Sequence, residues 1–98
     1  MSEIILNRVL EKVKNTEIQK LLLARAIKGL DNYDSLLVSD NDRDCEKDLL
    51  EELLDCLMYC KQCEIEGGGS SYSTMFGILT SLVVSVIENR DDLVDGKA

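Results

Sequence analysis

The sequence predicts an all-α protein: a helical hairpin or bundle of three to four helices that completes its core by homo-oligomerisation. Proline is absent, glycine is sparse, and aromatic residues make up only 4% of the 98 residues. Apolar residues recur at helical spacing along most of the chain, and no strands are expected. The length suits one domain. At this size a second subunit often buries apolar surface that the single chain leaves exposed. We therefore expect a single all-α domain over residues 1–90 and a frayed tail over 91–98.

The first thirty residues predict two helices joined at a break. Ser2 is the expected cap of the first helix, whose apolar residues are spaced for one helical face. The pattern breaks at Asn15, and Thr16 with Gln19 has the form of a capping box, which predicts a second helix from Thr16 to Leu30. A continuous helix over residues 3–29 with a local bend fits the pattern nearly as well.

A loop and a long helix follow. Gly29 predicts the end of the second helix, and residues 31–42 then form a loop long enough to be functional. Asn41 or Asp42 is the expected cap of a helix that spans residues 43–66.

This long helix has two chemically different faces. Leucines occupy one side, and a stripe of carboxylates occupies the other, with Tyr59 and Gln62 on the same arc. The stripe consists of Asp44, Asp48, Glu51, Glu52 and Asp55. Like charges four apart destabilise a helix, and no lysine lies among them. The stripe therefore predicts a cationic partner, either a divalent metal or basic residues of a neighbouring helix; the plain alternative is a solvated acidic face.

The segment GGGSSYS, residues 67–73, ends the long helix and opens a last helix from about Ser73 to Arg90. This helix is apolar on most sides, which predicts burial on nearly all of them. A monomer of four short helices buries too little to achieve that. We therefore expect a homo-oligomer, with the last helix or the leucine face of residues 43–66 at the interface.

Charge and cysteine usage restrict the partners and the compartment. The net charge is −8; residues 1–30 carry 6 − 3 = +3, and the remainder carries 5 − 16 = −11. This balance argues against duplex nucleic acid or an anionic membrane as the main partner, although a small basic site near the first half could hold one phosphate.

All four cysteines lie on the long helix, where they fit free thiols that pack as small hydrophobic residues. Neither a signal peptide nor a membrane span is expected, so the predicted location is the cytoplasm.

Part of the acidic helix resembles a known family. Glu51-Glu52 with Asp55 and Tyr59 resembles the EExxD…Y segment of the all-α nucleoside triphosphate pyrophosphohydrolases, the MazG-like group. Residues 25–64 are also similar to small proteins common in bacteriophage genomes, which places the protein in the host cytoplasm if it is phage-encoded. In the MazG-like group, two helices each supply an acid pair that holds Mg²⁺. Glu52 and Asp55 match the second pair.

The first acid pair of that family has no good match, since the upstream segment offers only Asp31 and Asp34 in the predicted loop. The resemblance implies a Mg²⁺ site at Asp48, Glu52 and Asp55, in which Asp44 and Asp48, or a symmetry-related subunit, substitute for the missing first pair. Mg²⁺ needs oxygen ligands that converge from more than one direction.

Three functions fit these patterns. The first is a phage-type protein that binds a phosphorylated nucleotide and sequesters it without cleavage, counteracting bacterial defence, by analogy with phage proteins that sequester nucleotide immune signals. The alternatives are a Mg²⁺-dependent pyrophosphohydrolase of MazG-like type and an acidic inhibitor that binds a host protein. Whether the protein is an enzyme stays open, although the absence of histidine excludes a Ser/His/Asp or Cys/His set.

The nucleotide hypothesis assigns roles to seven residues. Arg25, Lys28 and Arg43 bracket the predicted loop and would contact phosphate. Tyr33, Tyr59 or Tyr72 would stack on a base. Ser71 would donate a hydrogen bond to an anion at the start of the last helix. The plain alternatives are a flexible turn over residues 67–73 and ion pairs from Arg25 or Lys28 to Asp48 or Glu52.

Overall fold

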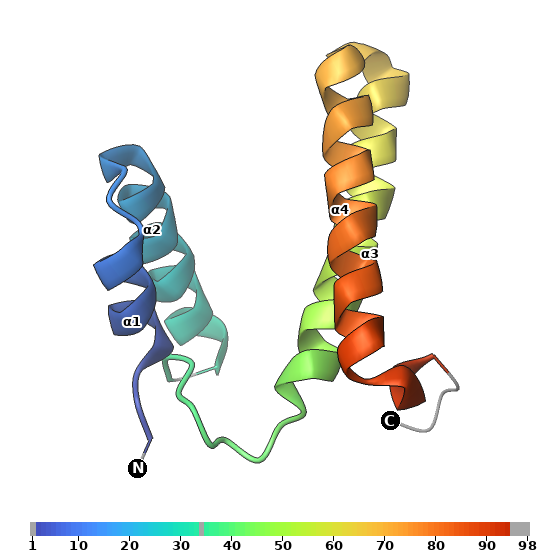
Figure 1. Cartoon of the computed structure of the whole chain (residues 1–98). Coiled ribbons are helices and arrows are strands. Elements are labelled where there is room, and N and C mark those ends of the chain that lie inside the picture. The colour runs from blue at the N-terminus through green and yellow to red at the C-terminus, as the bar shows by residue number, and fades with distance from the viewer. Residues whose placement is uncertain (1, 34, 95–98) are drawn as a thin grey trace. The chain divides into compact units, whose positions relative to one another are not determined.

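A computed structural model describes residues 2–33 and 35–94, and for Tyr33 it describes the backbone only. The helices are α1 (Ile5–Lys12), α2 (Thr16–Tyr33), α3 (Cys45–Cys63), the π-helical segment η1 (Glu64–Gly68), α4 (Ser70–Asn89) and the 3-10 turn η2 (Asp91–Leu93), as Figure 1 shows. The described residues form no strand, so the all-α class is confirmed there. The chain divides into two compact units, Met1–Arg43 and Asp44–Ala98. The single domain over residues 1–90 stays a prediction.

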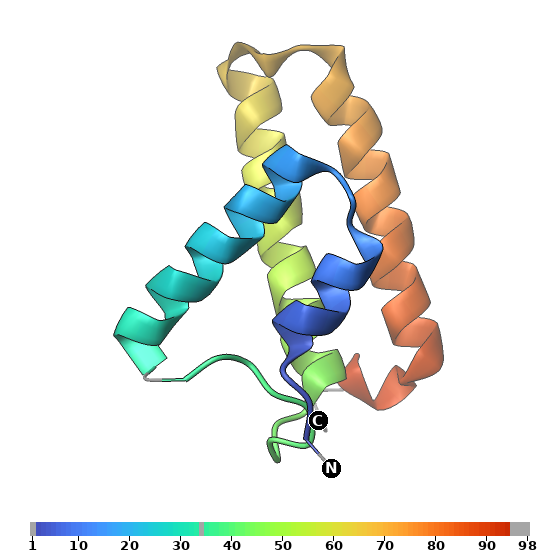
Figure 2. The same cartoon turned by 90° about the vertical axis from the view of Figure 1, so that its left-hand side faces the viewer.

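Two separate helices form the first unit, as the break at Asn15 predicted, and Figure 2 shows the turn between them. The expected capping box is wrong in its details. Asn15, not Thr16, caps α2, because its Oδ1 accepts a hydrogen bond from the Ile18 N–H at 3.1 Å. Gln19 turns back to donate to the Val13 carbonyl at 2.8 Å, which fixes the turn that joins α1 to α2.

The start of α1 is anchored by the backbone rather than by a side-chain cap. Ser2 does not cap the helix; the residue before the first turn is Ile4, which makes no side-chain capping bond. Instead, Ile4 pairs with Val38 in an isolated antiparallel bridge. The bonds run from Ile5 N to the Leu37 carbonyl at 3.0 Å, from Ser39 N to the Glu3 carbonyl at 2.8 Å and from Glu3 N to Ser39 Oγ at 2.8 Å. These bonds satisfy main-chain groups that a helix start otherwise leaves unpaired.

The second helix is longer than expected. Gly29 does not end α2, which continues to Tyr33. A glycine inside a helix costs only about 0.5–1 kcal/mol relative to alanine, so continued backbone hydrogen bonding can carry the helix past it. The connection to α3 then contains two residues in the left-handed region, Asp40 with φ 53° and Asp42 with φ 64°.

The cap of α3 also differs from the prediction. Asn41 accepts a hydrogen bond from Arg43 N at 3.0 Å within the connection, and neither Asn41 nor Asp42 caps the helix. Asp44 is the cap, because its carboxylate accepts from Lys47 N at 3.2 Å. The helix consequently begins at Cys45 rather than at Arg43.

The second unit is an antiparallel hairpin of α3 and α4, which lie side by side in Figure 1. Its core consists of Leu50, Val83 and Val86, with Leu53 and Leu57 packed against them. The chain reverses after η1 through Gly67 and Gly69, which have φ values of 102° and 86°. Glycine reaches such positive φ values without the Cβ clash that other residues meet.

The last helix begins at Ser70, three residues earlier than expected, and ends at Asn89. The expectation that α4 is buried on nearly all sides is wrong for the single chain, because only Val83 and Val86 of this helix are buried. Ile78, for example, remains 58% exposed. The reason is geometric: one neighbouring helix covers only one stripe of α4.

Three hydroxyl groups of α4 donate to carbonyl oxygens one turn earlier in the same helix. The bonds run from Thr80 to Phe76, from Ser81 to Gly77 and from Ser85 to Ser81.

Over its most apolar stretch α4 reaches a mean hydropathy of 1.5, and it is long and apolar enough to cross a membrane by length and composition alone. A core helix of a soluble protein meets the same criterion.

The tail expected over residues 91–98 begins with an ordered turn. Residues 91–93 form η2, and Arg90 pairs with Asp92 just after α4 ends. Residues 95–98 lie outside the part of the chain that the structure describes.

Candidate functional site

The acidic stripe is only partly solvated. Glu51, Glu52 and Asp55 are exposed on α3, and Asp48 is half-buried. Asp44 leaves the stripe altogether, because it caps α3 and binds Arg90. Asp44 therefore does have a cationic partner from the protein. That partner is Arg90 at the end of α4, not a residue of the basic first half.

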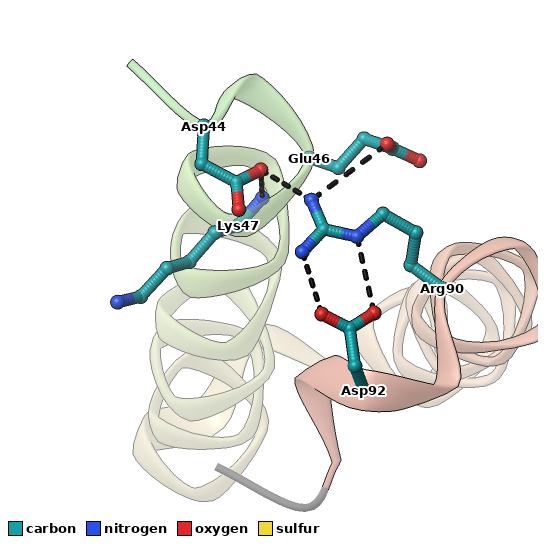
Figure 3. Close-up of polar contacts among 5 residues, drawn as sticks. All are labelled: Asp44, Glu46, Lys47, Arg90 and Asp92. Carbon is teal, nitrogen blue, oxygen red and sulfur yellow. Dashed lines mark hydrogen bonds and ion pairs between the residues drawn. The ribbon is translucent and has the colours of Figure 1, made fainter. Parts of the chain in front are cut away.

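Arg90 holds the open end of the hairpin together, as Figure 3 shows. Its Nη1 lies 2.6 Å from the Asp44 carboxylate and 3.9 Å from that of Glu46. Its Nη2 and Nε donate to the two oxygens of Asp92 at 2.8 and 3.2 Å, a two-pronged contact that suits the planar guanidinium. The start of α3 and the end of α4 are thus linked through one side chain.

These bonds change the acidity of the groups involved. The hydrogen bond from Arg90, together with the backbone bond from Lys47, lowers the pKa of Asp44 below its ordinary value. The hydrogen bond from Arg90 likewise lowers the pKa of Asp92. Hydrogen bonds to Asp92 and Asp44 raise the pKa of Arg90, so all three groups stay charged across the physiological range.

The Mg²⁺ site that the family resemblance implies, Asp48, Glu52 and Asp55, stays a prediction. All three residues lie on α3, and within residues 2–33 and 35–94 no three His, Cys, Asp or Glu side chains are grouped so that they could hold a metal ion. A single helix presents its carboxylates along one line, so further ligands would have to come from another element or another chain.

The predicted phosphate-contacting residues all belong to the first unit. Arg25 and Lys28 are exposed on α2, where their spacing of three places them side by side. Neither forms an ion pair with another described residue, whereas Arg8 pairs with Glu3 and Glu11. Arg43 lies at the other end of the connection and is exposed.

An apolar residue extends this basic pair. Leu21 is 66% exposed and precedes Arg25 by four residues, so Leu21, Arg25 and Lys28 share one face of α2. We call these three residues the α2 strip. It offers a hydrocarbon surface beside two positive charges, a combination that suits an anion with an apolar body.

Two of the three predicted stacking residues, Tyr59 and Tyr72, lie on different helices of the hairpin. Tyr59 is 67% exposed on the outer face of α3. Tyr72 is half-buried at the hairpin turn, and its carbonyl accepts a bond from the Cys60 thiol at 3.2 Å. Ser71 is exposed in the first turn of α4. The side chain of Tyr33 lies outside the described residues.

Apolar residues that sequence reasoning did not assign to any site form the wall of a groove near the hairpin turn, and two residues of the acidic face, Asp55 and Gln62, lie on its rim. It has a volume of about 680 Å³, and its apolar wall consists of Leu54, Leu57, Met58, Ile65 and Phe76. Its polar rim consists of Asp55, Lys61, Gln62 and Glu66. The volume falls in the range of small-molecule pockets, although the two carboxylates on the rim oppose a bare anion.

One lysine at the groove is committed to partners within the hairpin. Lys61 Nζ lies 4.6 Å from the centre of the Phe76 ring and 3.2 Å from the Glu64 carboxylate. Ser73 also donates to Glu64 at 2.9 Å. The bond from Ser73 and then that from Lys61 lower the pKa of Glu64.

The roles of Arg90 and of the groove could have been read from two signals. Arg90 is the last cation before the tail, and α3 and α4 have 19 and 20 residues, so an antiparallel hairpin brings Arg90 to the acidic start of α3. Met58 and Ile65 are apolar residues seven apart beside the acidic stripe.

No known family model, curated protein or solved structure matches this chain.

Proposed function

We propose that the protein acts as a self-associating binding protein that sequesters a phosphorylated nucleotide without cleaving it, in the manner expected of a phage protein that counteracts bacterial defence. The observation that carries the proposal is the α2 strip. Arg25 and Lys28 are neighbouring exposed cations with no ion-pair partner among the described residues. Because no described carboxylate pairs with either side chain, both charges are available to an external anion.

The chemistry of the strip favours a nucleotide over a simple anion. A phosphate group can take a two-pronged contact from Arg25 and a point charge from Lys28. The exposed Leu21 surface beside them would cover the face of a base. A helix surface of this kind encloses a ligand on one side only, so a second chain of a homo-oligomer would close the site.

Equilibrium dialysis tests the proposal with a panel of linear and cyclic nucleotides, with and without Mg²⁺. We expect binding by wild type, loss of binding in Arg25→Gln and in Lys28→Gln, and unchanged binding in Lys14→Gln. Lys14 is the matched control because it is also exposed and forms no ion pair with a described residue. Equal binding by all four proteins would contradict the assignment of the strip.

The fate of the nucleotide separates sequestration from catalysis. After heat denaturation and filtration, a sequestered nucleotide is recovered unaltered. Release of pyrophosphate in the presence of Mg²⁺, abolished in Glu52→Ala and Asp55→Ala, would instead establish the pyrophosphohydrolase alternative. The inhibitor alternative requires binding of a protein partner through the exposed carboxylates of α3, without any nucleotide.

A further inference from the structure

We infer that the α2 strip selects nucleotides that carry a single phosphate group, and that Asp31 excludes nucleotides with further phosphates. This inference rests on the proposed function, and it names the ligand class of the same site. Its basis is the sequence of charged and apolar side chains along α2, a single helix of the first unit.

The strip offers two positive charges. Arg25 and Lys28 supply them, and neither side chain pairs with another described residue. The remaining cation of α2, Lys20, lies 3.5 Å from the Glu17 carboxylate and is paired there. A phosphate monoester carries about 1.5 to 2 negative charges at pH 7. One such group therefore matches the charge of the strip.

A carboxylate lies just beyond the two cations. Asp31 follows Lys28 by three residues, so the two side chains are neighbours on the surface of α2. Asp31 is exposed, and it forms no ion pair with another described residue. The last turn of α2, which ends at Tyr33, also contains main-chain carbonyl groups without helical partners, and these make the same end of the helix more negative. Both features would repel a second phosphate group placed there.

The apolar end of the strip decides which way a nucleotide lies. Leu21 precedes Arg25 by four residues, about 6 Å along the helix axis, so a base on Leu21 leaves its phosphate beside Arg25 and Lys28. Ile18 is 46% exposed and extends the hydrocarbon surface toward the start of the helix. Any further phosphate then extends past Lys28 toward Asp31. The strip consequently accommodates one phosphate group between its apolar end and its acidic end.

The protonation of the phosphate supplies a test that protein side chains do not obscure. The second pKa of a phosphate monoester is about 6, so its charge approaches two only above that pH. A cyclic monophosphate is a diester, and it keeps one negative charge throughout. A site that matches two charges therefore binds the monoester more tightly as the pH rises, and it binds the diester equally.

The charged groups around the strip ordinarily keep their charge between pH 5 and 7.5. The chain contains no histidine, the side chain that ordinarily titrates in this range. The groups of α2 and of α1, which packs against it, are carboxylates, lysines and arginines. Besides the strip itself, they are Arg8, Glu11 and Lys12 of α1 and Glu17, Lys20 and Asp31 of α2.

Equilibrium dialysis of the full chain with AMP, cyclic AMP, ADP and ATP, without Mg²⁺, tests the inference. We expect AMP to bind roughly threefold more tightly at pH 7.5 than at pH 5, and cyclic AMP to bind equally at both. At pH 7.5, ADP and ATP should bind no more tightly than AMP. An affinity that rises with the number of phosphates would overturn the inference and leave the proposed function intact. If none of the four nucleotides binds, the proposed function falls, and this inference falls with it.

Asp31→Asn identifies the cause of the discrimination. This variant should bind ATP about fivefold more tightly than wild type does, with the affinity for AMP changed by less than about twofold. Glu17→Gln is the matched control, because it removes the same charge from the same helix about 21 Å away, and it should change neither affinity by more than about twofold. Circular dichroism verifies that both variants stay helical. Equal gains in ATP affinity in the two variants would overturn the assignment to Asp31.

Discussion

Different kinds of interaction stabilise the two units of the chain, each within itself. In the hairpin, Leu50, Val83 and Val86 are buried between α3 and α4. In the first unit none of the described residues is buried, and main-chain bonds between residues 3–5 and 37–39 connect its start to its end. One unit therefore has a small core of its own, whereas the other depends on backbone pairing and leaves its apolar residues half-buried or exposed.

The largest expected effect comes from the core of the hairpin. Leu50→Ala removes a buried side chain and should lower the free energy of unfolding by about 2–3 kcal/mol, measured by urea denaturation. Leu22→Ala in α2 removes a half-buried side chain and should cost about 1 kcal/mol. Equal costs at the two positions would remove the distinction between the units.

The turn of the hairpin should be the next most sensitive position. Gly69 has φ 86° and ψ −175°, a region that residues with a Cβ essentially avoid. Gly69→Ala should therefore lower the free energy of unfolding by about 1–3 kcal/mol. Gly77→Ala is the control, since an added Cβ there meets nothing within 4 Å in the interior of α4. That substitution should raise stability by about 0.5–1 kcal/mol, as helix propensity predicts.

Hydrogen exchange would sharpen the comparison without any substitution. Amides in the middle of α3, around Leu50 and Leu53, should exchange more slowly than those in the middle of α2, because the hairpin packs its helices around a core. Mass spectrometry of the peptides from each unit measures the difference. Slower exchange in α2 than in α3 would contradict the assignment of the core.

The smallest effect is expected from Arg90. The folded pKa values of Asp44 and Asp92 lie below their unfolded values, so their contribution to stability is complete above the unfolded pKa. It is lost as the pH falls through the folded values. Arg90→Gln should lower the Tm at pH 7. Below about pH 4, where the unfolded carboxyl groups titrate, the Tm of this variant should fall less with decreasing pH than the Tm of wild type. Glu64 keeps its own partners in this variant, so some decline remains.

Helical periodicity predicted all four main helices but placed several of their ends wrongly. Asn41, Asp42 and Asp44 all carry side-chain oxygens suitable for a cap, so composition alone did not identify the right one. The backbone decided, because Asp42 takes a left-handed conformation while Asp44 has the extended conformation that a cap requires. The candidate site was harder to predict, since the contact between Arg90 and Asp44 joins residues 46 apart in the sequence and the groove joins residues of α3 to Phe76 of α4.

The hydroxyl groups of Thr80, Ser81 and Ser85 have a consequence for how α4 tolerates dry surroundings. Each already donates to a carbonyl oxygen of its own helix, so removing water from it leaves no proton without an acceptor. Residues that count as polar in the sequence therefore behave as small, inert spacers. For this reason, burying several sides of α4 against protein would add little free-energy cost from the dehydration of these hydroxyl groups.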